Sequence, residues 1–396
     1  MRITPATELE YRIHTLQQYM AEERLDAVII LQNADLFYFT GTIQSGNLYV
    51  PAKGQPIYLV RKDFARARME CGLREVVPFA SMKDIPAVLA EYGYPQPSRI
   101  GMELDVLPVN LFERYRKVFP RGEFSDATPL IRQVRMIKSH YEIHILQDAA
   151  QQVDKVYRRA REVIREGMSD IELAAELEYV ARKEGHQGLV RMRAFNGEMV
   201  YAHVFSGTDT AVPAYLDTPL GGVGPHPCFG QGASWKRIER NEPVIVDFAG
   251  SYDGYLVDQT RIFAIGGISD RLRKGYDDML RVQARMEELA VPGVPWGTVY
   301  DECLALAVAM GYADHFMGGK GAQVSFIGHG LGLEIDEYPF IARGFNDMIL
   351  QEGMAFAFEP KVVFPGEGAV GIENTFYLTG SGLKRLTFSD EELVIV

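Results

Sequence analysis

The sequence predicts an α+β protein with two domains, in which an α/β domain precedes a larger domain of helix pairs and antiparallel strands. Three observations lead to this prediction. The chain has 396 residues, more than a single hydrophobic core usually serves. Helical and strand-like segments alternate up to about residue 138. Beyond that point, a pair of helical segments followed by strand-like segments occurs twice, which indicates an internal duplication.

The first domain is predicted to cover residues 1–138. Helical periodicity at residues 8–23 is followed by an apolar, strand-like run at 26–32. Residues 56–60 and 99–103 have the same strand-like composition, with helical segments between them. No cluster of catalytic residue types occurs here, so we expect an accessory domain.

The second domain is predicted to cover residues 139–396. A long helix is expected at 141–165, and a capping box at 169–172 begins the next one. The second helix pair is expected at 270–289 and 298–310, with a Pro- and Gly-rich break between its members. Strand-like segments follow each pair.

Composition and charge exclude several classes of function. The formal net charge of −12 argues against a general nucleic-acid-binding surface. No apolar run is long enough to span a membrane, and the N-terminus lacks a signal-peptide core. The three cysteines are widely spaced and odd in number, which excludes a cysteine-based metal site. They favour a reducing compartment, so we expect a cytoplasmic protein.

Four acidic residues and one histidine stand out, because each lies within an apolar or glycine-rich stretch of the second domain. They are Asp247, Asp258, His329, Glu359 and Glu373. A buried carboxylate is costly unless it is paired or bound to a metal. Two divalent cations would balance four carboxylates, and one neutral imidazole fits such a site. The sequence therefore predicts two divalent metal ions.

The acids also come in two pairs, each around a turn. If the strands on either side of 251–255 pair symmetrically, Asp247 and Asp258 lie directly opposite each other, with Cβ atoms roughly 5 Å apart. Glu359 and Glu373 are arranged in the same way around 365–368. Like charges at such a distance repel by about 4 kcal/mol. Oxygen-rich sites with one imidazole suit Mn, Co, Fe or Zn.

Each of these residues, taken singly, has a simpler explanation. An aspartate at a strand end is usually a turn or cap residue, Glu359 before Pro360 would simply end a strand, and His329 between glycines would be a turn residue. The occurrence of all five in ordered, strand-like contexts favours the metal site.

Several segments, in this order, resemble the pita-bread metallopeptidases, the group of methionine aminopeptidase, aminopeptidase P and prolidase. The resemblance spans the whole chain. In the first domain, Tyr38-Phe-Thr-Gly41 is similar to a segment of the creatinase-type N-terminal domain. The matching motifs of the second domain are Arg135-Met-Ile-Lys138, Asp247, Asp258 with Thr260-Arg261, Gly328-His329-Gly330-Leu-Gly332, Glu359-Pro360 and Glu373. The two-domain layout resembles the branch of aminopeptidase P and prolidase.

The resemblance implies a role for each residue. Asp247 would chelate one metal, Asp258 and Glu373 would bridge both, and His329 and Glu359 would complete the second. A metal-bridged hydroxide would attack an amide carbonyl, and Glu359 would shuttle its proton. The implied substrate is a small peptide with proline after the cleaved bond, manganese is among the implied metals, and a homodimer is expected.

Three positions depart from the family's pattern. Ala214 and Asp336 stand where the family has histidines, and Gly371 stands where the proline-directed branch has arginine. The family's histidines are thought to hold the substrate, so the specificity is left open. One hypothesis is that His203 or His226 replaces a missing imidazole. The alternative is that His203 is a core-edge residue and that His226 lies in a solvent-facing loop.

Two other classes of function are carried alongside the peptidase. Some pita-bread enzymes are lyases, such as the dimethylsulfoniopropionate lyase group, in which an aspartate near the metals is thought to act as base. Asp336 would have that role here, with a small molecule as substrate. Pita-bread domains also occur as non-catalytic binding modules, but these have generally lost the ligands that this chain retains.

Overall fold

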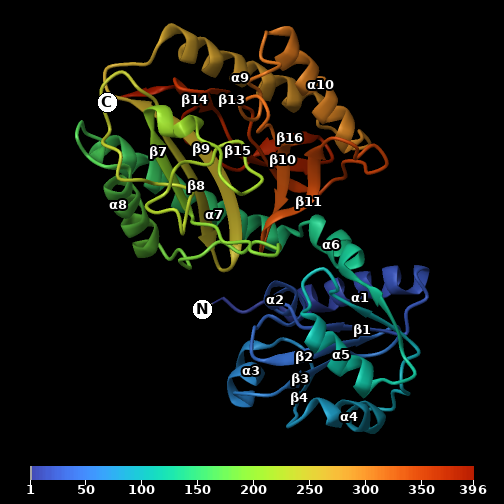
Figure 1. Ribbon diagram of the computed structural model, residues 1–396. Coiled ribbons are helices and arrows are strands. Elements are labelled where there is room, and N and C mark those ends of the chain that lie inside the picture. The colour runs from blue at the N-terminus through green and yellow to red at the C-terminus, as the bar shows by residue number, and fades with distance from the viewer. Residues whose placement is uncertain (1) are drawn as a thin grey trace. The chain divides into compact units, whose positions relative to one another are not determined.

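The computed structural model describes residues 2–396 and divides the chain into two compact units. The first comprises residues 1–135 together with Arg193–Asn196, and the second comprises Met136–Met192 and Gly197–Val396. Figure 1 shows a mixed α/β unit and a larger unit with antiparallel strands and long helices. This is the predicted α+β class. In the part of the chain that is described, no helix has the length and apolar character needed to span a bilayer.

The first unit contains one six-stranded sheet with the order β4-β3-β2-β1-β5-β6. Its strands are β1 (Ala27–Ile30), β2 (Gly46–Pro51), β3 (Ile57–Val60), β4 (Glu75–Pro78), β5 (Arg99–Met102) and β6 (Glu123–Asp126). Its helices are α1 (Ala6–Glu22), α2 (Asn33–Thr40), α3 (Phe64–Glu70), α4 (Ile85–Glu91), α5 (Val109–Val118) and α6 (Thr128–Met136), which reaches the second unit, with a short 3-10 turn at Met82–Asp84. The expected helix and all three expected strands are present, and β2, β4 and β6 are strands that the sequence did not indicate.

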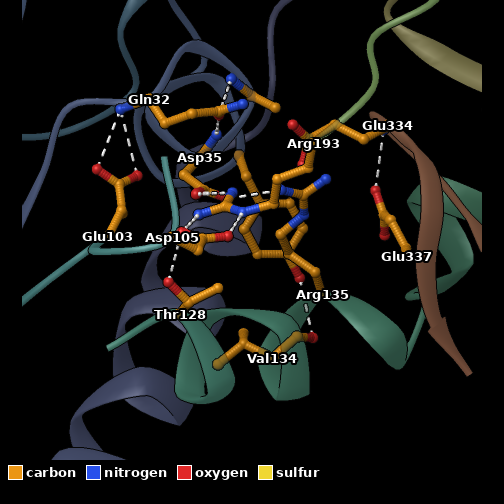
Figure 2. A network of polar contacts seen from close by, with 12 residues as sticks. Gln32, Asp35, Glu103, Asp105, Thr128, Val134, Arg135, Arg193, Glu334 and Glu337 are labelled. Carbon is orange, nitrogen blue, oxygen red and sulfur yellow. Dashed lines mark hydrogen bonds and ion pairs between the residues drawn. The ribbon is translucent and has the colours of Figure 1, made fainter. Parts of the chain in front are cut away.

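A buried ion-pair network lies beside this sheet (Figure 2). Asp35 on α2 is fully buried and binds Arg135 Nη1 at 2.5 Å and Arg193 Nη1 at 2.6 Å. Arg193 also binds Asp105 at 2.6 Å. The two guanidinium groups hold the pKa of Asp35 below its usual value, even though burial acts to raise it.

The second unit contains the two predicted helix pairs. The first pair is α7 (His140–Val163) and α8 (Asp170–Lys183), and the second is α9 (Asp270–Leu289) and α10 (Trp296–Ala309). Ser139 and Ser169 each form a capping box at the start of a helix, with Glu142 and Glu172 respectively. The box at Ser169 was predicted from the sequence and is confirmed. Both helix pairs are followed by strands, as expected.

The strands of the second unit form three sheets. The first has the order β17-β9-β8-β7, the second β11-β10-β12-β15-β16, and β13 pairs only with β14. The bounds are β7 (Ala202–Ser206), β8 (Val244–Tyr252), β9 (Tyr255–Ala264), β10 (Phe326–Leu331), β11 (Ile335–Ala342), β12 (Ala355–Phe358), β13 (Lys361–Phe364), β14 (Gly368–Gly371), β15 (Asn374–Thr379), β16 (Gly382–Arg385) and β17 (Val394–Ile395). A 3-10 turn, Gly207–Ala211, follows β7.

Helices cover these sheets from outside. The helix α7 packs against β8 and β9, and α9 packs against β13 and β14, as Figure 1 shows. The apolar core beneath α9 and α10 includes Trp296, Tyr276 and Phe356, each exposed by 1% or less. The strands are therefore fixed on one face, and their other face can present polar side chains.

Candidate active site

Asp247 and Asp258 lie on the paired strands β8 and β9, but not directly opposite each other. Asp247 faces Thr260, and Asp258 faces Ala249. The predicted direct opposition is wrong because the hairpin turns at Asp253-Gly254, where Tyr252 pairs with Tyr255. The two aspartates are diagonal neighbours on the same face, and diagonal positions of paired strands are roughly 7–8 Å apart.

Glu359 and Glu373 extend the ladder of β13 and β14. Lys361 pairs with Gly371 in that ladder, and two residues further out the same register places Glu359 opposite Glu373. The backbone of Ile372 donates to Pro360 O at 3.2 Å, which continues the ladder towards the two glutamates. His329 lies on β10, which pairs with β12 immediately before Glu359. The predicted opposition of the two glutamates agrees with this register.

The five predicted residues line one cavity, together with His203, Asp336 and Tyr201. Ligand atoms of Asp258, His329 and Glu373 lie within 4.8 Å of one another. His329 Nε2 is 3.8 Å from Glu373 Oε1 and 3.9 Å from Glu359 Oε1. Side-chain exposure is 13% at Asp247, whereas the other four residues are buried. The charges thus face one another in a site that is largely closed to water.

Lys361 lies inside this cluster and was missed by the sequence analysis. Its side chain is fully buried, and Nζ is 2.5 Å from Glu359 Oε2, 2.9 Å from Glu373 Oε2 and 3.5 Å from Asp247 Oδ2. A signal was available, because side chains two residues apart in a strand point to the same face. Lys361 follows Glu359 by two residues in an otherwise apolar run.

Burial and mutual repulsion shift the pKa values of the cluster. Burial raises the pKa of Asp247 to about 6 and that of Glu359 to about 8, although Lys361 beside them acts to lower both. Burial, together with Glu373 and Asp247, raises the pKa of Asp258 well above its ordinary value. The pKa of Glu373 is lowered because Lys361 and His329 outweigh its burial. Nearby positive charge therefore outweighs burial at Glu373, but not at Asp247, Asp258 or Glu359.

Neighbouring polar groups hold the acids in place. Thr260 Oγ1 donates to Glu373 Oε2 at 2.7 Å, and Arg261 Nη1 donates to the backbone oxygen of Glu373 at 2.8 Å. Thr375 exchanges two hydrogen bonds with the backbone of Asp258, at 2.8 and 2.9 Å. The Thr260-Arg261 dipeptide therefore positions Glu373 rather than lining the cavity itself.

The two candidate replacement histidines occupy different environments. His203 on β7 pairs in register with Asp247, is 4% exposed, and lines the cavity. Its Nε2 has no hydrogen-bond partner within residues 2–396, and burial lowers its pKa to about 4. His226 is exposed, accepts a hydrogen bond from the backbone of Cys228 through Nδ1, and is not among the lining residues. The structure brings only His203 to the cluster.

The three departures from the resemblance also have defined positions. Asp336 lines the cavity from β11, with Oδ1 3.7 Å from His329 Nδ1 and a positive φ of 65°. Ala214 is outside the lining, although Leu216, Asp217 and Thr218 just after it contribute to the wall. A Cβ added at Gly371 would lie 2.5 Å from Lys361 Cγ, so this glycine leaves room for the lysine.

Comparison with known proteins agrees with this arrangement. A model of metallopeptidase family M24 matches residues 144–380, and a model of the creatinase/prolidase N-terminal domain matches residues 12–137. The chain belongs to metallopeptidase family M24. The M24 match contains all five predicted residues and Lys361. Membership confirms the resemblance seen in the sequence and makes the chain a peptidase-type hydrolase with a pita-bread domain.

Relatives of this M24 chain extend over its whole length. It is 30% identical to an Xaa-Pro dipeptidase of Pyrococcus furiosus, over 98% of this chain and 100% of that protein. Among solved structures, an Xaa-Pro dipeptidase from Bacillus anthracis has a TM-score of 0.83 at 27% identity and covers 98% of this chain and 100% of its own. A prolidase from Pyrococcus horikoshii OT3 has a TM-score of 0.80 at 27% identity, over 97% and 100% of the two chains.

The family M24 is metal-dependent, and part of the cluster fits a divalent cation well. Asp258, His329 and Glu373 offer two carboxylates and one imidazole within a short distance, a donor set that suits Mn, Fe, Co or Zn. Asp247 and one oxygen each of Glu359 and Glu373 face the Lys361 ammonium instead. The number and identity of the ions stay predictions.

Proposed function

We propose that this M24 chain is a metal-dependent peptidase that cleaves short peptides at an Xaa-Pro bond. One observation carries the proposal: the predicted donor residues all line a single cavity in a chain whose full-length relatives are named Xaa-Pro dipeptidases. The substrate class rests on those relatives, and the reaction class rests on the cluster.

The cation would be held by Asp258, His329 and Glu373, with Glu359 beside them. Bound there, a divalent cation polarises a carbonyl group and lowers the pKa of a water molecule towards neutrality. The sequence predicts a second ion at Asp247 as well. Thr260 and Arg261 keep Glu373 oriented towards the cavity through the hydrogen bonds described above.

Glu359 would move the proton. Its carboxyl group is buried in the cavity wall and faces His329 on one side and Lys361 on the other. A carboxylate in this position can accept a proton from the attacking water and return it to the leaving nitrogen.

His203 and Asp336 would contact the peptide. The Nε2 of His203 is buried without a partner in the described chain and lines the cavity, so it can hydrogen bond to a substrate oxygen or nitrogen. Asp336, partly exposed at 37%, would accept a hydrogen bond from a cationic group such as a free peptide amine. The family's pattern has histidines at positions 214 and 336; His203 is a histidine at a different position, and Asp336 is not a histidine.

The test is hydrolysis of a dipeptide panel by the full chain. Ala-Pro and other Xaa-Pro dipeptides are compared with Pro-Ala and Ala-Ala, after chelation and after readdition of Mn²⁺, Co²⁺ or Zn²⁺. We expect cleavage of the Xaa-Pro members only, lost on chelation and restored by at least one ion. Glu359→Gln should lower kcat by at least about a hundredfold.

A pair of histidine variants distinguishes the substrate contact from a general effect. His203→Ala should lower kcat/KM by on the order of a hundredfold, whereas the exposed His226→Ala should not change it. No cleavage of any Xaa-Pro dipeptide with any ion would contradict the proposal. Release of product from a sulfonium or ammonium acid without addition of water would support the lyase alternative, with Asp336 as base.

A further inference from the structure

Lys361 occupies the place in the cluster where a cation would bind Asp247. Its Nζ contacts oxygens of three of the four carboxylates, at 2.5, 2.9 and 3.5 Å. The fourth, Asp258, groups with His329 and Glu373 instead. The cluster therefore has two halves, one centred on an ammonium group and one composed only of potential ligands.

The position of Lys361 follows from the backbone and is not a chance rotamer of a surface side chain. Lys361 is fully buried on β13, directly opposite Gly371 on β14. A Cβ at residue 371 would lie 2.5 Å from Lys361 Cγ and 2.5 Å from Pro360 O. A side chain at residue 371 would therefore clash with the lysine stem and with the backbone beside it. Within the buried wall, the three carboxylates are the charged partners that its ammonium meets.

The carboxylate oxygens that Lys361 already contacts favour a single divalent ion beside this ammonium. Four carboxylates carry four negative charges. One dication and the Lys361 ammonium leave a net charge of −1, and two dications with the ammonium leave +1, so the number of ions is decided by the oxygens available to them. A second dication at Asp247 would also need the same oxygens of Glu359 and Glu373 that already accept hydrogen bonds from the Lys361 ammonium. Like charges cannot share those oxygens at contact distance without a large repulsion.

We propose that the Lys361 ammonium takes the place of one of the two metal ions, so that this chain binds a single divalent cation through Asp258, His329 and Glu373. Asp247 is then the partner of Lys361 and not a metal ligand. The inference rests on the proposed metal-dependent function. It lowers the predicted number of metal ions from two to one, and it makes the Lys361 ammonium a fixed positive charge in the site.

Metal binding by the full chain tests the inference. The apo-protein is dialysed against Mn²⁺, the bound ion is counted per chain by elemental analysis, and the electron paramagnetic resonance spectrum is recorded. We expect one ion per chain, with the resolved hyperfine lines of an isolated Mn²⁺. Lys361→Met should allow a second ion and introduce the spectrum of two coupled ions. Lys138→Met, which removes another buried lysine paired with Glu337, should keep one ion.

A second variant keeps the test decisive if Lys361→Met fails to fold. Asp247→Asn should still bind one ion with unchanged affinity, because Asp247 contacts the ammonium. Two ions in the unaltered chain, or loss of the bound ion in Asp247→Asn, would overturn the inference. One ion per chain with no peptide cleavage would instead contradict only the proposed function, and two ions with cleavage would contradict only this inference.

Discussion

Asp170 gives the second unit a pH-dependent stability that does not involve the active site. It is the first residue of α8, is fully buried, and accepts a hydrogen bond from Ser206 Oγ to Oδ1 at 2.7 Å. Its Oδ2 has no hydrogen-bond partner in the described part of the chain. Burial raises its pKa from 3.8 to about 7, although Ser206 and Lys236 act to lower it.

The raised pKa makes the folded state bind the proton more tightly than the unfolded chain does. Stability is therefore full below about pH 4, falls as the pH rises through the interval from 3.8 to about 7, and is constant above it. Because a tenfold change in proton affinity corresponds to about 1.4 kcal/mol, the loss is about 4 kcal/mol. Asp170→Asn removes the ionisation and leaves an amide whose N–H₂ can occupy the position of Oδ2.

The assay is urea unfolding of both proteins between pH 4.5 and pH 8.5. The difference in unfolding free energy, variant minus parent, should rise by about 3 kcal/mol across that range, because about 1 kcal/mol is already lost at pH 4.5 and other titrating groups cancel in the difference. Asp301→Asn, at an exposed position on α10, is the matched control and should give a flat difference. A flat difference for Asp170→Asn as well would refute the argument.

Three further substitutions test the packing within each unit, and urea unfolding measures their effect. Gly250→Ala would place a Cβ 2.0 Å from Val153 Cγ2, so the unfolding free energy should fall by about 1–3 kcal/mol. Asp35→Ala removes a buried carboxylate from Arg135 and should cost the first unit about 3–5 kcal/mol. Trp296→Ala should cost the second unit about 3–5 kcal/mol through the cavity that it leaves. Changes within about 0.5 kcal/mol of the parent would contradict each expectation.

The elements that the sequence predicted well are those with a local chemical signal. The helix start at Ser169 follows from the Ser-x-x-Glu pattern, in which both hydrogen bonds are made within four residues. The five predicted residues, which line one cavity, were singled out because a charged side chain in an apolar run is costly wherever the run folds. Such signals do not depend on contacts far along the chain, so the sequence alone reveals them.

The elements that it predicted poorly depend on register or on distant segments. The position of Asp247 relative to Asp258 is set by the two residues at which the hairpin turns, and a shift of one position in the turn changes every cross-strand pair. His203 and His226 are equally plausible from sequence, because only the path of β7 beside β8 brings the first of them to Asp247. Composition does not specify either of these.

Lys361 shows where an electrostatic argument from sequence is incomplete. Buried carboxylates need cations nearby, but the number of carboxylates does not reveal whether a metal ion or a side chain supplies the positive charge. Lys361, two residues after Glu359, supplies one of those charges from the chain itself. The departure from the family's arginine at Gly371 is then explained, because a side chain there would displace the lysine stem. The number of metal ions is therefore better predicted when a lysine close in sequence to the acids is counted with them than from the acids alone.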